Sequence, residues 1–173
     1  TNIMNENIAV IGGGQMGSQI AALAAMAGYK TSIYDSNEEY LNEKIKFTRE
    51  NILNLIDKCK YNQTHLENFD KNLKIFNFLE DTVENKTFVI EAVVEKFDVK
   101  LDIFKKLSQI LDANVVLATN SSFIQASEIS QHCNHPERFI NMHFFYPPIR
   151  MDLVEISFPS NASEETINRT KDV

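Results

Sequence analysis

The sequence has few cysteines, no excess of positive charge and no long apolar run, and each absence argues against a class of protein. Its two cysteines, Cys59 and Cys133, lie far apart and form no Cys-x-x-Cys pair, which argues against a disulfide framework or a zinc site. The formal net charge is -7, so nucleic acids and anionic membrane surfaces are not expected partners. No apolar run approaches the roughly 18 residues that a membrane-spanning helix needs. Residues 1–7 carry no targeting pattern, and we therefore expect a cytoplasmic protein.

Short apolar runs alternate along the chain with helical patterns. Strands are predicted at residues 8–11, 31–34, 73–76, 88–90, 115–118, 139–143 and 153–156. Helices are predicted at residues 16–27, from about 37 to 59, at 99–111, at 125–130 and from 164 onward. This alternation favours an α/β fold with a doubly wound, mostly parallel sheet and helices on both faces.

Local signals predict where the first two helices begin and end. Gly28 is well placed to terminate the first helix. Ser36 and Glu39 have the spacing of a capping box for the second, and residues 61–63 are expected to break it. One face of that second helix is expected to be apolar through Leu41, Ile45, Ile52 and Ile56.

A glycine motif separates the first predicted strand from the first predicted helix. The run Gly-Gly-Gly-Gln-Met-Gly, which begins at Gly12, satisfies G-x-G-x-x-G. Gly12 permits the tight turn, Gly14 lets the backbone approach a pyrophosphate, and Gly17 allows close packing of helix on strand. The helix N-terminus, at Gln15 and Met16, would direct free N–H groups and the positive end of its dipole at the phosphates. The sequence therefore predicts a dinucleotide site.

Asp35 ends the second predicted strand. Its carboxylate can accept hydrogen bonds from both hydroxyls of an adenosine ribose, and it would repel a 2′-phosphate. Because Ser36 and Asn37 supply no compensating cation, we expect NAD rather than NADP as the cofactor. The alternative is that Asp35 begins an ordinary turn.

A histidine and a glutamate are the candidates for proton transfer. His143 ends a predicted strand, and the carboxyl ends of parallel strands line the ligand crevice in doubly wound folds. Glu155 follows twelve residues later among apolar neighbours, where a buried carboxylate needs a partner. A carboxylate beside an imidazole would orient it and stabilise its protonated form. The spacing alone leaves two alternatives open: that His143 closes the strand without a catalytic role, and that Glu155 faces solvent.

Four groups of residues occur together in an order typical of one family. They are residues 12–21, the run Val89-Ile-Glu-Ala-Val-Val-Glu95 with Lys100, the run Ala118-Thr-Asn-Ser-Ser122, and residues 138–156. The motifs cover nearly the whole chain, and residues 1–173 together resemble the NAD-binding domain of L-3-hydroxyacyl-CoA dehydrogenases. The resemblance implies a Rossmann-type fold and hydride transfer between NAD and an L-3-hydroxyacyl-CoA, which gives a 3-ketoacyl-CoA.

The resemblance also implies roles for single residues. His143 would remove the 3-hydroxyl proton during oxidation and return it during reduction, with Glu155 as its partner. Ser122 would form a hydrogen bond with the substrate oxygen beside the nicotinamide, and Asn120 would shape that loop.

Further positions are matched to the cofactor and to CoA. Glu95 and Lys100 are similar to cofactor-contacting positions, although Lys100 could instead lie in a solvated helix start. Asn51 and Lys58 lie near positions that meet CoA. Tyr146 stands where the family usually has Asn, whose amide helps to hold the nicotinamide and substrate region. Tyrosine offers a larger side chain with only a hydroxyl, so this departure could alter substrate preference or activity.

The resemblance implies more protein than these residues. Residues 164–173 begin a helix in which the chain stops, and relatives continue into a helical domain that supplies substrate contacts and most of the dimer contact. We therefore expect a homodimeric full-length protein, and a 173-residue chain that binds NAD but turns over acyl-CoA poorly.

Two alternative functions remain open from the sequence. A related dehydrogenase of the L-gulonate or carnitine type would act on a free hydroxy acid, and Tyr146 keeps this open. A non-catalytic NAD-binding relative is the other. No metal site is expected, because the remaining histidines lack ligand spacing; they are His65, His132 and His135.

Overall fold

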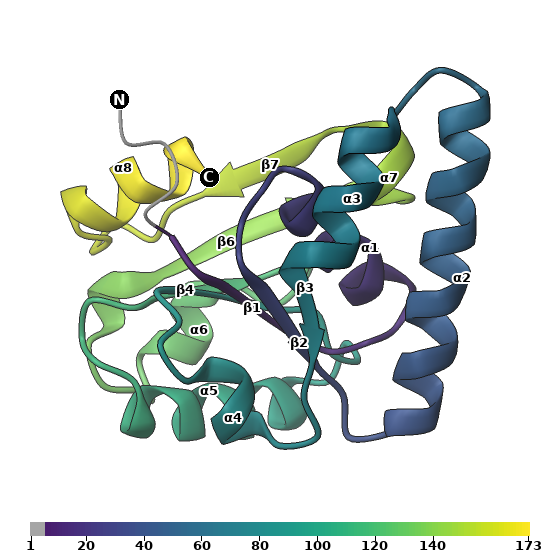
Figure 1. Ribbon diagram of the computed structural model, residues 1–173. Helices are drawn as coiled ribbons and strands as arrows, with labels where there is room; N and C mark the ends of the chain where they lie inside the picture. Colours follow the sequence, from purple (N-terminus) through teal and green to yellow (C-terminus); the bar gives the residue numbers. More distant parts are fainter. Residues whose placement is uncertain (1–5) are drawn as a thin grey trace.

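Seven strands form a single sheet with the order β3-β2-β1-β4-β5-β6-β7 in the computed structural model, which describes residues 6–173 (Figure 1). The strands are β1 (Ile8–Ile11), β2 (Thr31–Tyr34), β3 (Leu73–Ile75), β4 (Phe88–Glu91), β5 (Val116–Thr119), β6 (Phe139–Phe144) and β7 (Val154–Ser157). Every neighbouring pair is parallel except β6 and β7, which are antiparallel. The predicted mostly parallel sheet is confirmed. Most of the segment considered for a targeting pattern, residues 1–5, lies outside the described residues.

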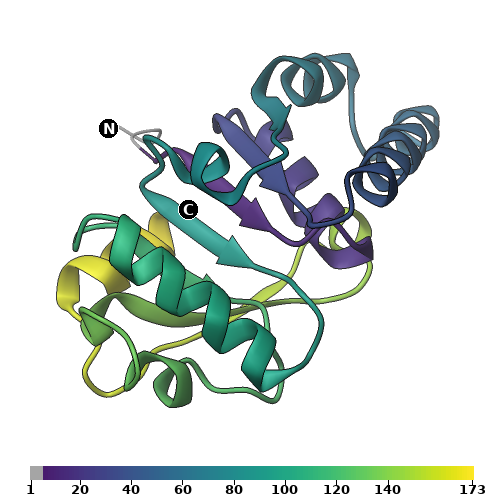
Figure 2. The same ribbon diagram turned by 90° about the horizontal axis from the view of Figure 1, so that it is seen from below.

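Helices cover both faces of this sheet. They are α1 (Gln15–Met26), α2 (Glu38–Asp57), α3 (Gln63–Asn72), α4 (Leu79–Val83), α5 (Phe97–Ile110), α6 (Ala126–Ser130), α7 (Pro148–Met151) and α8 (Glu164–Asp172), with a 3₁₀ helix, η1 (Pro136–Arg138), before β6. Figure 2 shows α5 lying across one face of the sheet, with α1 and the long α2 toward the other side. Over residues 6–173, no helix combines the length and apolar character that crossing a membrane requires.

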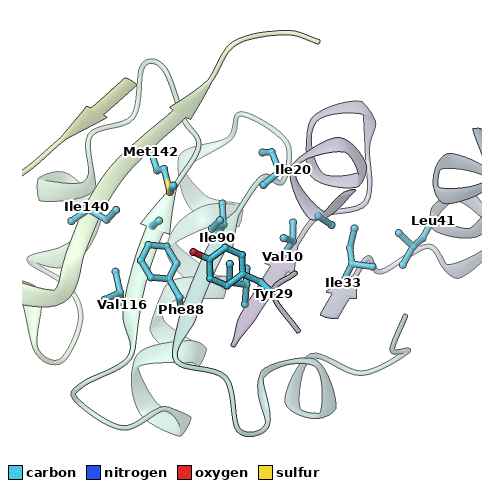
Figure 3. Close-up of a cluster of buried hydrophobic side chains, with 13 residues drawn as sticks. Val10, Ile20, Tyr29, Ile33, Leu41, Phe88, Ile90, Val116, Ile140 and Met142 are labelled. Carbon is cyan, nitrogen blue, oxygen red and sulfur yellow. The ribbon is translucent and has the colours of Figure 1, made fainter. Parts of the chain in front are cut away.

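Alternate residues of the central strands β1, β4, β5 and β6 contribute to two apolar cores. Figure 3 shows the first, in which Val10, Ile90 and Ile140 of the sheet lie with Ile20 of α1 and Tyr29. The second core lies on the opposite face and contains Phe104 and Leu107 of α5. Because the central strands are buried on both faces, they read as continuous apolar runs, as parallel strands do.

The structure corrects several local predictions. The start of α2 is capped by Asn37, whose side chain accepts a hydrogen bond from the backbone N–H of Tyr40, so the predicted capping box of Ser36 and Glu39 is wrong. Gly28 does follow the end of α1, with a positive φ of 102°. Three helices had not been predicted, namely α3, α4 and α7.

The strand order determines where a dinucleotide can lie. The chain runs outward from β1 to β2 and β3, and then returns to place β4 on the other side of β1. The crevice at this reversal lies beyond the carboxyl ends of β1 and β4, which is where ligands bind in open α/β sheets. The glycine motif, which follows β1, therefore lies at the edge that the fold makes available for binding.

Candidate active site

The turn between β1 and α1 leaves no room for side chains at two of its glycines. Gly12 has a φ of 111°, and a Cβ there would lie 2.5 Å from the carbonyl oxygen of Ala92. A Cβ on Gly17 would lie 1.7 Å from the carbonyl oxygen of Gly12. At Gly14, by contrast, the nearest heavy atom would be the Tyr40 hydroxyl at 3.7 Å. The space in front of Gly14 is open, as the approach of a pyrophosphate requires.

Asp35 faces this glycine turn from the end of β2. One of its carboxylate oxygens accepts a hydrogen bond from the backbone N–H of Gly13 at 2.8 Å, and the other accepts from that of Asn37 at 2.9 Å. The carboxylate thus helps to form the turn and remains partly exposed. Each oxygen retains a lone pair that a ribose hydroxyl can use, so the structural and cofactor interpretations of Asp35 are compatible.

A cleft of about 840 Å³ extends from the glycine turn across the β2 side of the sheet. Its walls come from the β1–α1 turn, the end of β2, the start of α2, the segment before α4, the loop after β4, and α5. The lining residues include Gly12, Gly14, Gln15, Met16, Asp35 and Tyr40. The predicted cofactor residues of the glycine motif, except the buried Gly17, therefore share one cavity with Asp35.

His143 and Glu155 are Cα partners in the antiparallel pairing of β6 with β7. Directly opposed residues project their side chains to the same face of a sheet. Glu155 is exposed, as in the alternative that the sequence left open and not as a buried carboxylate, because β7 is an edge strand with alternate residues exposed. Among the described residues the two side chains form no mutual hydrogen bond, and the His143 ring packs against Phe145 at 5.3 Å between ring centroids. The register of β6 with β7 nevertheless places the two side chains on the same face of the sheet.

Three further predicted residues lie at the carboxyl ends of β5 and β6. The side-chain oxygen of Asn120 accepts a hydrogen bond from the backbone N–H of Phe144 at 2.9 Å. Asn120 therefore fixes the chain directly after His143 to the loop after β5. Ser122, on that loop, is exposed, and Tyr146 is 58% exposed. Both side chains are open to a ligand at this edge of the sheet.

Comparisons with known proteins agree with this geometry. Residues 7–173 match the family described as "3-hydroxyacyl-CoA dehydrogenase, NAD binding domain". The chain belongs to this family. It is 36% identical to a probable 3-hydroxybutyryl-CoA dehydrogenase of Bacillus subtilis (strain 168), over 93% of this chain and 56% of that protein. It is 30% identical to the mitochondrial hydroxyacyl-coenzyme A dehydrogenase of Homo sapiens, over 98% of this chain and 56% of that one.

A solved structure extends the comparison to the fold. The crystal structure of 3-hydroxybutyryl-CoA dehydrogenase from Escherichia coli K12 superimposes with a TM-score of 0.89 and 29% identity, over 95% of this chain and 34% of that one. The expected family, Rossmann-type fold and NAD cofactor are therefore confirmed. The chain spans about half the length of the curated relatives it matches.

Within this 3-hydroxyacyl-CoA dehydrogenase domain, Lys100 does not lie in a solvated helix start. It is 1% exposed, and its ammonium group lies 2.5 Å from a carboxylate oxygen of Glu91. The carboxylate of Glu95 lies 3.5 Å from the same ammonium and is partly exposed. Contact between the cofactor and Glu95 or Lys100 stays a prediction, and Glu91 is an additional residue whose role had not been predicted.

The predicted CoA residues lie on α2 and at its end. Asn51 is half-buried and Lys58 is exposed, and their spacing of seven residues is two helical turns, so they share a face. Near them, Lys60 forms an ion pair with Asp152 at 2.6 Å. This pair joins the α2–α3 turn to the segment between His143 and Glu155. A ligand on α2 would therefore lie close to the segment that carries the proton-transfer candidates.

Proposed function

We propose that this chain is the cofactor-binding part of an enzyme that interconverts L-3-hydroxyacyl-CoA and 3-ketoacyl-CoA with NAD. The observation that supports the proposal most strongly is the opposition of His143 and Glu155 on β6 and β7. They lie at the carboxyl end of β6. In the strand order, β6 is on the β4 side of β1, whereas Asp35 follows β2 on the other side. A dinucleotide whose adenosine lies at Asp35 would extend its nicotinamide toward this end of the sheet.

The cavity at the glycine turn fits the pyrophosphate, because Gly14 is open while Gly12 and Gly17 allow the tight turn behind it. The first turn of α1 would hold the phosphates with its free N–H groups and the positive end of its dipole. Asp35 would accept hydrogen bonds from the adenosine ribose. When bound, NAD supplies the acceptor for a hydride.

His143 would take the proton from the 3-hydroxyl of the substrate as general base, and would return it to the 3-keto oxygen in the reverse direction. Glu155, on the same face, would orient the imidazole and stabilise its protonated form. Ser122 would donate a hydrogen bond to the substrate oxygen. Asn120 would keep the segment after His143 in register with the loop that carries Ser122.

The other parts of the proposal concern the whole protein. CoA would lie along α2 near Asn51 and Lys58, and a helical domain after residue 173 would complete the substrate site and form a homodimer. The 173-residue chain would then bind NAD and turn over acyl-CoA poorly. The cytoplasm is the proposed location, in keeping with two free cysteines, Cys59 and Cys133, and with a bacterial relative.

A second candidate is a dehydrogenase that acts on a free hydroxy acid. The exposed Tyr146 favours it, because a bulky phenol at this edge of the site changes the space and the hydrogen-bond donors available to a substrate. In this alternative His143 and Glu155 keep their roles, and only the group recognised beyond the reacting carbon differs.

The proposal is tested by measuring how fast the full-length protein reduces acetoacetyl-CoA. The decrease in NADH absorbance gives this rate. We expect turnover, and a loss of at least about 100-fold in His143→Ala, the low end of what general acid–base catalysis contributes. The matched control His132→Ala, which removes an exposed histidine beyond α6, should retain full rate. Turnover of free hydroxy acids alone would favour the second candidate. NADH binding without any turnover would indicate a non-catalytic relative.

A further inference from the structure

Glu91 is a fully buried carboxylate whose two oxygens are both engaged. It is the last residue of β4 and is 0% exposed. One oxygen accepts hydrogen bonds from the backbone N–H of Val93 at 2.8 Å and from the ammonium group of Lys100 at 2.5 Å. The other accepts from the hydroxyl of Thr119, the last residue of β5, at 2.7 Å. Glu91 thus joins the carboxyl ends of two neighbouring strands to the first turns of α5.

The contacts continue from Lys100 to the surface loops. Its ammonium group also lies 3.3 Å from the carbonyl oxygen of Val93 and 3.5 Å from the carboxylate of Glu95. The second oxygen of Glu95 accepts a hydrogen bond from the hydroxyl of Ser121, which itself accepts from the backbone N–H of Ile124 at 2.8 Å. A continuous polar chain therefore ties the loop after β4 to the loop after β5.

Stability alone is a poor explanation for this arrangement. A buried ion pair contributes little compared with apolar residues of the same volume, because removing two charges from water offsets their attraction. The network also joins three ionisable side chains, Glu91, Lys100 and Glu95, where the loops after β4 and β5 meet. One loop carries Glu95 and the other carries Ser122, next to Ser121. The main effect of the observed contacts is therefore to hold these two loops in a fixed position relative to each other.

We infer that Glu91 is a positioning residue that holds the two loops in the arrangement that receives the nicotinamide half of the cofactor. The inference rests on the proposed NAD binding. The adenosine half would lie toward β2, at Asp35. The loop after β4 reaches the cleft at Asp35 through Ala92, Val93 and Val94, whereas the tethered Glu95 and Ser121 are not among the residues that line it. Loss of the tether would therefore affect NADH far more than ADP-ribose, which contains the adenosine and pyrophosphate but no nicotinamide.

Titration calorimetry with NADH and with ADP-ribose measures this difference on the 173-residue chain. In Glu91→Gln we expect NADH affinity to fall by about tenfold, as for the loss of a charged hydrogen bond. ADP-ribose affinity should change by less than about twofold, because the tethered Glu95 and Ser121 do not line the cleft at Asp35. A purely structural role would weaken both ligands equally, and that result would overturn the inference.

Ser121→Ala tests the same tether without leaving a buried charge unpaired, and so remains informative if Glu91→Gln folds poorly. Its matched control is Ser108→Ala, which removes another buried hydroxyl, one that donates to the carbonyl of Lys105 within α5 at 3.0 Å and is not part of this polar chain. We expect weaker NADH binding in the first variant and unchanged binding in the second. If the native chain binds no NADH, the proposed cofactor role fails. If it binds NADH and both Glu91→Gln and Ser121→Ala keep the native ratio of affinities, the positioning role alone fails.

Discussion

His143 and Glu155 lie directly opposite each other across the antiparallel pair formed by β6 and β7. The chain turns through α7 between them, and this reversal brings two residues that are twelve positions apart onto one face of the sheet. β7 is the edge strand, and Glu155 is open to solvent. Any interaction of its carboxylate with the imidazole of His143 would therefore take place at the solvent-exposed edge of the sheet.

Replacing this carboxylate should affect turnover and leave cofactor binding unchanged. In the full-length protein we expect Glu155→Gln to lower kcat for acetoacetyl-CoA reduction by about tenfold or more, since a neutral amide stabilises the protonated imidazole less well. NADH affinity should not change. Ser157→Ala, at an exposed position two residues along β7 and on the same face, is the control. If Glu155→Gln keeps the native kcat, Glu155 has no role in the proposed proton transfer.

Asp35 should decide between the two nicotinamide dinucleotides. For the native chain we expect micromolar NADH affinity and much weaker NADPH binding, because the carboxylate would repel a 2′-phosphate. Asp35→Ala should weaken NADH by about tenfold or more, since it removes charged hydrogen-bond acceptors. Asp35→Asn, which keeps one acceptor oxygen, should bring the two affinities closer together. Fluorescence titration measures all of these values, and equal affinities in the native chain would contradict the assigned role.

Two glycines of the motif should respond differently to the same substitution. Gly17→Ala places a Cβ against the carbonyl oxygen of Gly12, and we expect a loss of at least about 2 kcal/mol in the free energy of unfolding, as for overpacking. Gly14→Ala meets nothing closer than 3.7 Å, so it should fold normally while its methyl group obstructs the pyrophosphate and weakens NADH binding. Thermal unfolding and NADH titration separate the two effects. Similar stability in both variants would contradict the geometry of the turn.

The pair of Glu6 and Arg169 should make stability depend on acid pH. Burial alone would raise the pKa of Glu6, but hydrogen bonds from Arg169 and Thr87, together with the charge of Arg169, hold that pKa below its ordinary value. The stabilisation is therefore complete above the unfolded pKa of about 4.3, and it is lost as the pH falls through the lower folded value.

Urea unfolding of the native chain and of Glu6→Gln measures this contribution. We expect a difference of about 1–2 kcal/mol at pH 7, which closes at acid pH below the folded pKa. Glu165→Gln is the matched control, because Glu165 also approaches Arg169, at 3.5 Å, but is 71% exposed and should have little effect. If the difference in unfolding free energy between the native chain and Glu6→Gln stays constant down to pH 3, the ion pair of Glu6 and Arg169 does not cause it.

Much of the fold could be predicted because its information is local. The central strands are mostly apolar, and the predicted strands at residues 8–11 and 31–34 have the same bounds as β1 and β2. Helix α3 escaped prediction because only Leu66 and Phe69 are buried in an otherwise polar segment. Helices α4 and α7 span five and four residues, which is too short for a periodic pattern.

Some residues of the candidate site could also be predicted from local sequence, and others could not. The glycines and Asp35 could be found because their spacing within one strand-turn-helix unit carries the information. The exposure of Glu155 depends on β7 being the edge of the sheet, which alternation alone does not reveal. Glu91 ends an apolar strand nine residues before Lys100, and a buried carboxylate requires a partner. That signal was present in the sequence, but the contact with Thr119 depends on the order of the strands.

A crystal structure of the chain with NADH tests the central claim most directly. We expect the adenosine ribose at Asp35, the pyrophosphate in front of Gly14, and the nicotinamide ring at the carboxyl ends of β5 and β6, facing the imidazole of His143. An imidazole turned into the interior, or a nicotinamide outside this edge of the sheet, would contradict the proposed proton transfer.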